Sequence, residues 1–121
     1  MKTTLELGGQ PRTFHFGSGF IGNCLDTIGV DFQGLFDMMR NNPYKVIPIM
    51  MFESYKFNLW LEDKEPDCTQ KDFIRWISEE PDTDDSAQNK WVNEFMESRT
   101  KHLPKDEPVK PGKKKPVKRK A

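Results

Sequence analysis

The 9 Phe, 2 Tyr and 3 Trp residues of this 121-residue chain all lie between Phe14 and Phe95, and this distribution limits where a core can form. Aromatic side chains bury large apolar areas, so a folded unit must be built around them. The residues from Pro104 onward have no apolar periodicity with which to join that unit. We therefore predict one domain over residues 1–103 and a separate tail over residues 104–121.

The two parts of the chain carry opposite charge, although the formal net charge is zero. Residues 1–103 contain 11 basic and 17 acidic residues, whereas residues 104–121 contain 8 basic and 2 acidic ones. The sequence has no run of about twenty apolar residues that could span a bilayer, and residues 1–4 lead into a strand pattern instead of the apolar centre of a signal peptide. We expect a soluble protein that stays in the cytoplasm where it is made and has no membrane partner.

Two short segments alternate between apolar and polar residues, as strands with one buried face do. They cover residues 3–7 and 12–16, and residues 8–11 between them are rich in turn formers. This pattern predicts an antiparallel β-hairpin. His15 would lie on its polar face, where we expect an ordinary exposed side chain.

Two helices are predicted after the hairpin. Ser18 can cap the first one, whose apolar residues recur at helical spacing as far as Gly29, which can end it. Asp31 can cap the second helix, and residues 41–43 stop it. Cys24 falls on the apolar face of the first helix, so we interpret it as a small core residue and not as a nucleophile.

The segment from Pro43 to Leu61 is apolar on nearly every side, which predicts a central helix packed by neighbours all round. Pro48 complicates its start, because proline has no N–H to donate and clashes with the carbonyl group four residues earlier. We therefore predict a turn over residues 43–47 and a regular helix from Pro48 onward. A longer, kinked helix that includes Pro48 is the alternative.

Two more helices complete the predicted domain. Thr69 and Asp72 form a capping box that opens the fourth helix, with Trp76 at the edge of its apolar stripe. The predicted fold is α+β and predominantly α, with an N-terminal β-hairpin, about five helices and a disordered basic C-terminal tail. The residues expected to face the core are Phe73, Ile74 and Ile77 in the fourth helix, and Trp91, Val92, Phe95, Met96 and Leu103 in the fifth.

The three glycines Gly17, Gly19 and Gly22 have the spacing of a dinucleotide-binding fingerprint, after a strand and at the start of a helix. That fingerprint requires a parallel strand–helix–strand unit, whereas this strand is predicted to pair in a hairpin and the next element is another helix. We therefore interpret the glycines as residues of a tight turn and of close packing.

Other signs of catalysis or metal binding are weak. A calcium loop starting at Asp82 would have Ala87 where glycine is needed and Asn93 where the bidentate glutamate belongs. Cys24 and Cys68 lack the spacing of zinc ligands, so we interpret both as reduced thiols. We predict no enzymatic activity, no catalytic residues, no metal and no cofactor.

The basic end of the tail could attract any polyanion, and it also resembles a nuclear import signal. It contains no aromatic residue that could stack on bases, so binding of nucleic acid would be weak, sensitive to salt and indifferent to sequence. A solubilising or docking tail is the simpler interpretation. The residues that would bind a polyanion are Lys113, Lys114, Lys115, Lys118, Arg119 and Lys120.

Three segments give the domain a family likeness: Thr13–Gly17, then Asn42–Phe52, then Tyr55–Asn58. With the order of hairpin, helix pair, central apolar helix and final Trp-containing helix, the chain resembles phage tail assembly chaperones over residues 1 to about 100. The resemblance implies a protein without enzymatic activity. It implies transient binding of the long, helical tape-measure protein while the tail tube polymerises, with the tail tube protein and a second copy as further candidate partners.

The resemblance also implies that the protein acts in the host cytoplasm and is absent from the mature virion. Many family members are made in two lengths by ribosomal frameshifting, and Lys113–Lys115 could be encoded by a slippery A-rich run. The two other hypotheses are a small polyanion-binding protein that acts through its tail and a regulatory adaptor for some other protein.

The domain has more large apolar side chains than its predicted helix faces need. Adjacent methionines on a helix point about a hundred degrees apart, so one core face can seldom hold both. Exposed methionine and tryptophan side chains are suited to protein recognition. We predict that the partner-binding anchors are drawn from Met50, Met51, Trp76 and Trp91.

Overall fold

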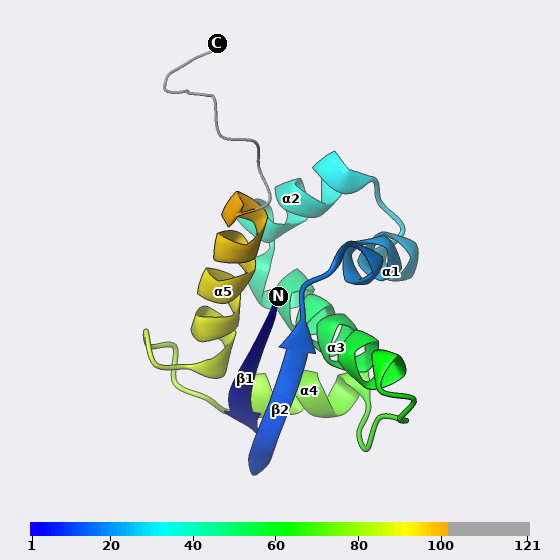
Figure 1. Ribbon diagram of the computed structural model, residues 1–121. Helices are drawn as coiled ribbons and strands as arrows, with labels where there is room; N and C mark the ends of the chain where they lie inside the picture. The colour runs from blue at the N-terminus through cyan, green and yellow to red at the C-terminus, as the bar shows by residue number, and fades with distance from the viewer. Residues whose placement is uncertain (102–121) are drawn as a thin grey trace.

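The computed structural model describes residues 1–101, and over these residues it has the predicted α+β architecture of one hairpin and five helices (Figure 1). The tail predicted over residues 104–121 and the core position predicted for Leu103 lie outside the described residues. No helix within residues 1–101 combines the length and the apolar character that a bilayer crossing requires. The elements are β1 (Lys2–Leu7), β2 (Gln10–His15), α1 (Ser18–Ile28), α2 (Phe32–Asn41), α3 (Pro43–Leu61), α4 (Gln70–Ser78) and α5 (Ala87–Lys101).

The two strands pair in antiparallel fashion, with Leu7 opposite Gln10 at the turn. Gly8 and Gly9 form this turn with φ of 64° and 83°, a left-handed conformation that glycine adopts without steric cost. A side-chain carbon at Gly8 would also lie 2.7 Å from the ring of Trp76, so this glycine lets α4 approach the hairpin. The hairpin predicted from the alternation is confirmed.

The buried face of the hairpin carries a charged residue, Arg12, which is only 3% exposed. Its guanidinium group donates to the carbonyl of Leu7 at 2.8 Å and to the hydroxyl of Tyr55 at 2.9 Å, and it lies over the ring of Trp76. It also forms a 2.8 Å ion pair with Asp67, which accepts a second hydrogen bond from the hydroxyl of Tyr55. These contacts tie the hairpin to α3 and to the loop that precedes α4.

The first two helices begin and end close to where the sequence predicts. Ser18 does not cap α1, because Gly17 occupies that position; the N–H of Gly17 donates to Nδ1 of His15 at 3.0 Å and fixes the turn one residue earlier. Gly29 ends α1 in the left-handed conformation, with φ of 82°. Asp31 caps α2 as predicted, since its side chain accepts a backbone N–H of the first turn at 2.7 Å.

The central helix starts five residues earlier than predicted, so the longer helix is correct and the regular start at Pro48 is wrong. A proline inside a helix costs about 3 kcal/mol. Val46 and Ile47 in the preceding turn are 0% and 2% exposed, and burying two such side chains contributes about 3–6 kcal/mol. Pro43 at the first helical position also presets the backbone for a helix that begins there.

The last two helices each bury a narrow stripe of their surface. The capping box of Thr69 and Asp72 is present in both directions, as predicted. Residues one position beyond the stripe are rotated by about 100°, which explains why two predicted core residues are exposed instead. Phe73, Ile77, Trp91 and Phe95 are buried and Val92 is partly buried, whereas Ile74 and Met96 are 42% and 46% exposed.

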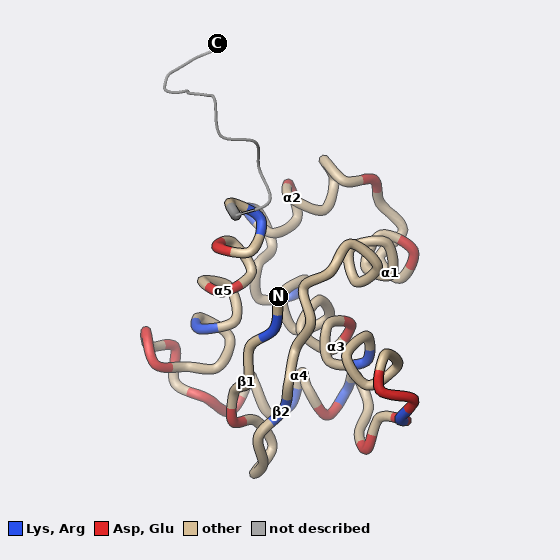
Figure 2. The backbone as a smooth tube through the Cα atoms, in the orientation of Figure 1, with Lys and Arg blue, Asp and Glu red and all other residues tan. Residues whose placement is uncertain are grey.

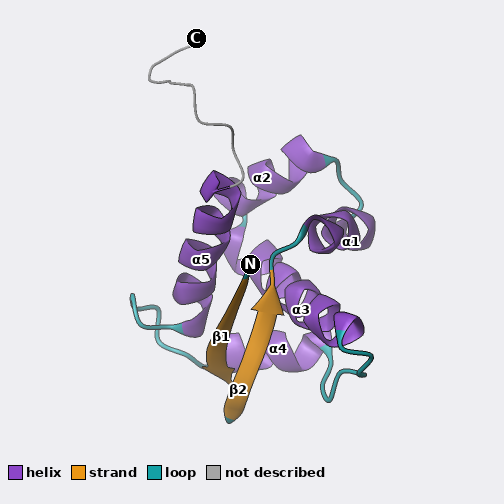
Figure 3. Cartoon of the chain, in the orientation of Figure 1, coloured by secondary structure: helices purple, strands orange, loops and turns teal. Residues whose placement is uncertain are grey.

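The core lies where α3 meets the hairpin, with the other helices arranged around it (Figure 3). Trp91 stacks on Phe95 in α5, with ring centroids 5.2 Å apart, and both rings contact Phe16 and Phe20 edge-on or tilted. The indole N–H of Trp91 donates to the hydroxyl of Ser54 at 3.0 Å, so its one polar group is satisfied inside the core. Cys24 is fully buried, as predicted.

Candidate functional site

The structure places three of the four predicted anchors inside the core. Met50, Met51 and Trp91 are each 0% exposed, so the surface position considered for them is wrong. The adjacent methionines are both buried because α3 is covered on several sides. The prediction had assumed that only one face of the helix contacts the core. Trp76 is partly buried between the hairpin turn and Arg12. The basic residues from Lys113 to Lys120 lie outside the described residues.

Two other aromatic side chains are the most exposed large apolar groups of the described chain, Tyr44 and Trp60, at 69% each. The hydroxyl of Tyr44 donates to Asp82 at 2.7 Å, which gives this side chain a structural role. The indole N–H of Trp60 has no hydrogen-bond partner within residues 1–101. Trp60 is therefore the exposed aromatic residue for which the described fold supplies the least explanation.

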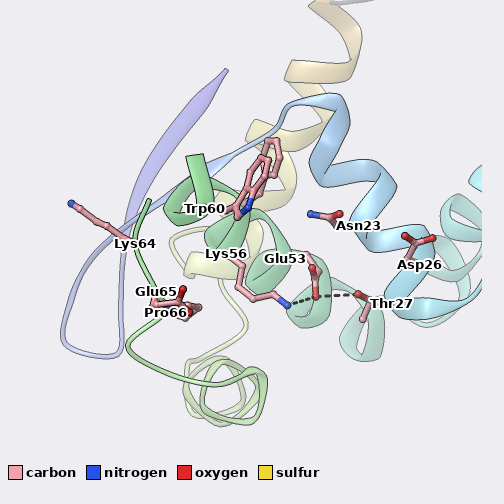
Figure 4. A pocket seen from close by; sticks show the side chains of 10 residues that line it. Asn23, Asp26, Thr27, Glu53, Lys56, Trp60, Lys64, Glu65 and Pro66 are labelled. Carbon is pink, nitrogen blue, oxygen red and sulfur yellow. Dashed lines mark hydrogen bonds and ion pairs between the residues drawn. The ribbon is translucent and has the colours of Figure 1, made fainter. Parts of the chain in front are cut away.

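A groove runs beside Trp60, between α1 and the C-terminal half of α3 (Figure 4). At one end it is apolar, a hollow of about 460 Å³ lined by Gly19, Asn23, Phe57 and Trp60. It continues into a more polar hollow of about 370 Å³. The residues that line this second part in addition are Asp26 and Thr27 from α1, Glu53 and Lys56 from α3, and Lys64, Glu65 and Pro66 from the loop after α3.

The aromatic end of the groove follows from helical spacing. Phe57 and Trp60 are three residues apart on α3, so their side chains are neighbours, and their rings stack with centroids 5.9 Å apart. Phe57 reaches α1 at Gly19, where a side-chain carbon would lie 2.7 Å from the ring. Gly22 has nothing within 4 Å of such a carbon. The glycine motif thus serves a turn at Gly17 and close packing at Gly19. The strand before it pairs in an antiparallel hairpin, whereas a dinucleotide-binding fold requires parallel strands.

His15 packs against Phe57, which lines the groove. Its ring packs edge-on against Phe57 with centroids 5.2 Å apart, and its Nδ1 accepts the N–H of Gly17. Burial lowers the pKa of His15, and the nearby N-terminal amine and Lys2 lower it further. The expectation of an ordinary exposed histidine is therefore wrong: a neutral, partly buried imidazole holds the turn that presents Gly19.

The polar end of the groove is built on a buried carboxylate. Glu53 is 4% exposed, and its Oε2 accepts from the hydroxyl of Thr27 at 3.2 Å and from Nζ of Lys56 at 3.1 Å. Its other oxygen has no hydrogen-bond partner within residues 1–101. Asp26 and Glu65, which line the same hollow, form no ion pair with any described residue. Two carboxylates are thus free to meet a positively charged group.

The far wall of the groove is positioned by the way α3 ends. Asp63 adopts a left-handed conformation with φ of 58°, which aspartate tolerates better than most residues. The N–H of Asp63 donates to the carbonyl of Trp60, and that of Lys64 to the carbonyl of Leu59, as in a Schellman motif. This turn folds the acidic loop over residues 62–67 back beside α3, where Figure 2 shows its cluster of acidic residues.

The chemistry available to catalysis in the described chain is limited. No group of three or more His, Cys, Asp or Glu side chains within residues 1–101 could hold a metal ion. Burial raises the pKa of the Cys24 thiol far above neutral, and burial raises that of Cys68 to about 11, so both stay protonated and poorly nucleophilic. What the groove offers is an aromatic surface beside unpaired carboxylates, which is suited to recognising a chain with an apolar and a basic side chain.

The helical spacing of the residues in α3 could have indicated this site. Residues 47, 50, 51, 54, 55 and 58 form one helical stripe, and all of them are buried. Glu53, Phe57 and Trp60 form a second stripe at spacings of four and three residues. Two stripes that both carry large apolar side chains favour two different uses for one helix, but the sequence does not tell which stripe the rest of the fold covers.

Comparison with known proteins gave no relatives. The chain matched no protein-family model, and searches of the curated proteins and of the solved structures returned no significant match.

Proposed function

We propose that this protein is a phage tail assembly chaperone that acts by binding the tape-measure protein transiently, through the groove between α1 and α3. The observation that carries the proposal is the stacked pair of Phe57 and Trp60, with Trp60 69% exposed at the mouth of a groove. The likeness of residues 1 to about 100 to that family supplies the identity of the partner. The exposed pair supplies a place for it to bind.

An aromatic pair left in water gains free energy when a partner covers it. Burying a large apolar side chain on binding contributes about 1.5–3 kcal/mol, and tryptophan is enriched among the residues that dominate interfaces. A helix with apolar residues at i, i+3 and i+4 can place one of them against Trp60 and Phe57. The tape-measure protein, as a long helical partner, would offer such faces repeatedly.

The small size of the groove favours a transient complex. Hollows of about 370 and 460 Å³ hold one or two side chains, not a whole helix face. Interfaces that bury little area bind weakly and are released easily, as a chaperone that leaves before the virion matures requires. A purified virion examined by mass spectrometry should contain the tape-measure protein and lack this one.

Co-expression with the tape-measure protein of the same phage tests the proposal, with size-exclusion chromatography of the product. We expect the two proteins to elute together and earlier than this protein alone. Separate elution of two folded proteins, over protein concentrations up to about 100 μM where weak complexes form, would refute tape-measure binding. The tail tube protein, co-expressed in the same way, is the matched comparison for partner choice.

A further inference from the structure

We propose that the groove between α1 and α3 also binds a segment of this protein's own tail, Pro108–Lys115. The segment reads Pro-Val-Lys-Pro-Gly-Lys-Lys-Lys. A Pro-x-x-Pro sequence favours the extended polyproline conformation, which has no internal hydrogen bonds and loses little entropy when it binds. Grooves lined with aromatic side chains are the usual receptors for such segments.

The aromatic end of the groove fits the first half of the segment. The ring faces of Phe57 and Trp60 offer flat apolar surface for Pro108 and Val109. An extended segment without internal hydrogen bonds must find partners for its carbonyl groups. Two donors border this end, the indole N–H of Trp60 and the side-chain amide of Asn23, and neither has a hydrogen-bond partner within residues 1–101.

The polar end fits the lysines that follow. Asp26 and Glu65 have no ion pair within the described chain, and Glu53 has one carboxylate oxygen without a partner. The described lysines at this end are already engaged, Lys56 with Glu53 and Lys64 with Glu62. The groove therefore has unpaired negative charge, whereas residues 104–121 carry 8 basic and 2 acidic residues.

The end of α5 lies near the turn that leads to the Gly19 end of the groove. Arg99, near the end of α5, donates to the carbonyl of Phe16 at 2.8 Å, so α5 ends beside the turn that leads to Gly19. Pro108 is seven residues beyond Lys101, an extended reach of about 23 Å. The Gly19 end of the groove therefore lies nearer to the end of α5 than the carboxylates do, which matches the order of the Pro-Val-Lys-Pro sequence and the lysines.

Docking of the tail has a consequence that rests on the proposed function: a partner must displace the segment before it reaches Trp60. Exposed ion pairs contribute little each, so the segment binds weakly. Its effective concentration on a short linker is nevertheless about millimolar, which is enough to occupy the groove in the absence of a partner. The tail would then shield Trp60 from unrelated apolar surfaces.

The test compares two variants of the full-length protein by two-dimensional NMR, without any partner. Pro108→Ser with Val109→Ser alters the proposed segment, and Pro116→Ser with Val117→Ser alters the second Pro-Val-Lys sequence as a matched control. Both variants keep every charge. We expect the indole N–H signal of Trp60 and the amide signals of Gly19 and Asn23 to shift in the first variant and not in the control. Acrylamide should quench the total tryptophan fluorescence more strongly in the first variant, because Trp91 is fully buried and Trp76 partly buried in both.

Three results would overturn the proposal. Groove signals that stay unchanged in the first variant would show that the segment does not bind there, and equal shifts in both variants would show no preference for it. Shifts that vary with protein concentration would identify another copy as the occupant. None of these results depends on the tape-measure protein, so the tail proposal can fail while the proposed function stands, and the reverse.

Discussion

Two tryptophan–phenylalanine pairs in this fold have nearly the same local geometry and opposite surroundings. Trp91 stacks on Phe95 with centroids 5.2 Å apart and is fully buried, while Trp60 stacks on Phe57 at 5.9 Å and is 69% exposed. Each pair is set by the three- or four-residue spacing of its own helix. The difference comes from what lies opposite: Phe16 and other aromatic rings close over the first pair, whereas His15 and Gly19 contact only Phe57 of the second pair and leave Trp60 exposed. The same kind of aromatic pair is therefore part of the core in one region and an exposed surface in the other.

Truncation of each tryptophan should affect the stability of the protein very differently. Trp91→Ala should lower the free energy of unfolding by about 3–5 kcal/mol, because it opens a cavity and removes the indole N–H that donates to the hydroxyl of Ser54. Trp60→Ala should change it by about 0.5 kcal/mol or less. Chemical denaturation followed by circular dichroism measures both. Equal losses for the two variants would mean that Trp60 is a core residue after all.

The contact between Gly19 and Phe57 offers a smaller effect with a matched control. Gly19→Ala puts a carbon 2.7 Å from the Phe57 ring and should destabilise the protein by about 1–2 kcal/mol, since the ring must move. Gly22→Ala, in the same helix with nothing nearby, should stabilise it by about 0.5–1 kcal/mol through helix propensity. Thermal unfolding of both variants decides this. If Gly19→Ala stabilised the protein, the Phe57 ring would have to move without cost, and this side of the groove would be flexible.

Asp67, at the end of the acidic loop after α3, gives the smallest predicted effect. A hydrogen bond from Tyr55, aided by one from Arg12, lowers the pKa of Asp67 to about 2 against its partial burial. Because the folded pKa lies below the ordinary value near 4, this stabilisation is present above about pH 4 and is lost as pH falls towards 2. Asp67 is about half exposed, so the contribution is modest.

Asp67→Asn should reduce the dependence of unfolding free energy on pH between about 4 and 2, as measured by denaturation at a series of pH values. Undiminished dependence would assign the acid sensitivity to other carboxylates.

At high pH, burial raises the pKa of Tyr55 to about 12, so the stability that the neutral Tyr55 contributes should be lost as pH rises from about 10 towards 12. Tyr55→Phe should weaken that loss.

Local signals in the sequence were sufficient for most of the fold. Asp31 and the Thr69–Asp72 pair cap their helices as expected, because capping depends on residues a few positions apart. The start of α3 was not predictable in this way. Pro48 disfavours a helix through this segment, but the free energy gained when distant elements bury Val46 and Ile47 is larger than the cost of the proline. Arg12 was missed for the same reason, since its partners are 43 and 55 residues away.

Exposed large apolar side chains were predicted, but at the wrong positions on α3 and α5. A surplus of large apolar side chains does indicate exposed ones, but composition does not say which. Met50, Met51 and Trp91 are covered because several elements converge on α3, while Trp60 lies one turn beyond that coverage. Helix periodicity gives the faces of a helix, and tertiary packing decides which face is left open.

Isothermal titration calorimetry with wild type, Trp60→Ala and Ile74→Ala would show whether Trp60 anchors the tape-measure protein. Ile74 is the control because it is 42% exposed on α4 and does not line the groove. If Trp60 is the anchor, its truncation should weaken binding by about thirtyfold or more, equivalent to about 2 kcal/mol. Ile74→Ala should stay within about twofold of wild type. Wild-type affinity in a folded Trp60→Ala variant would contradict the account.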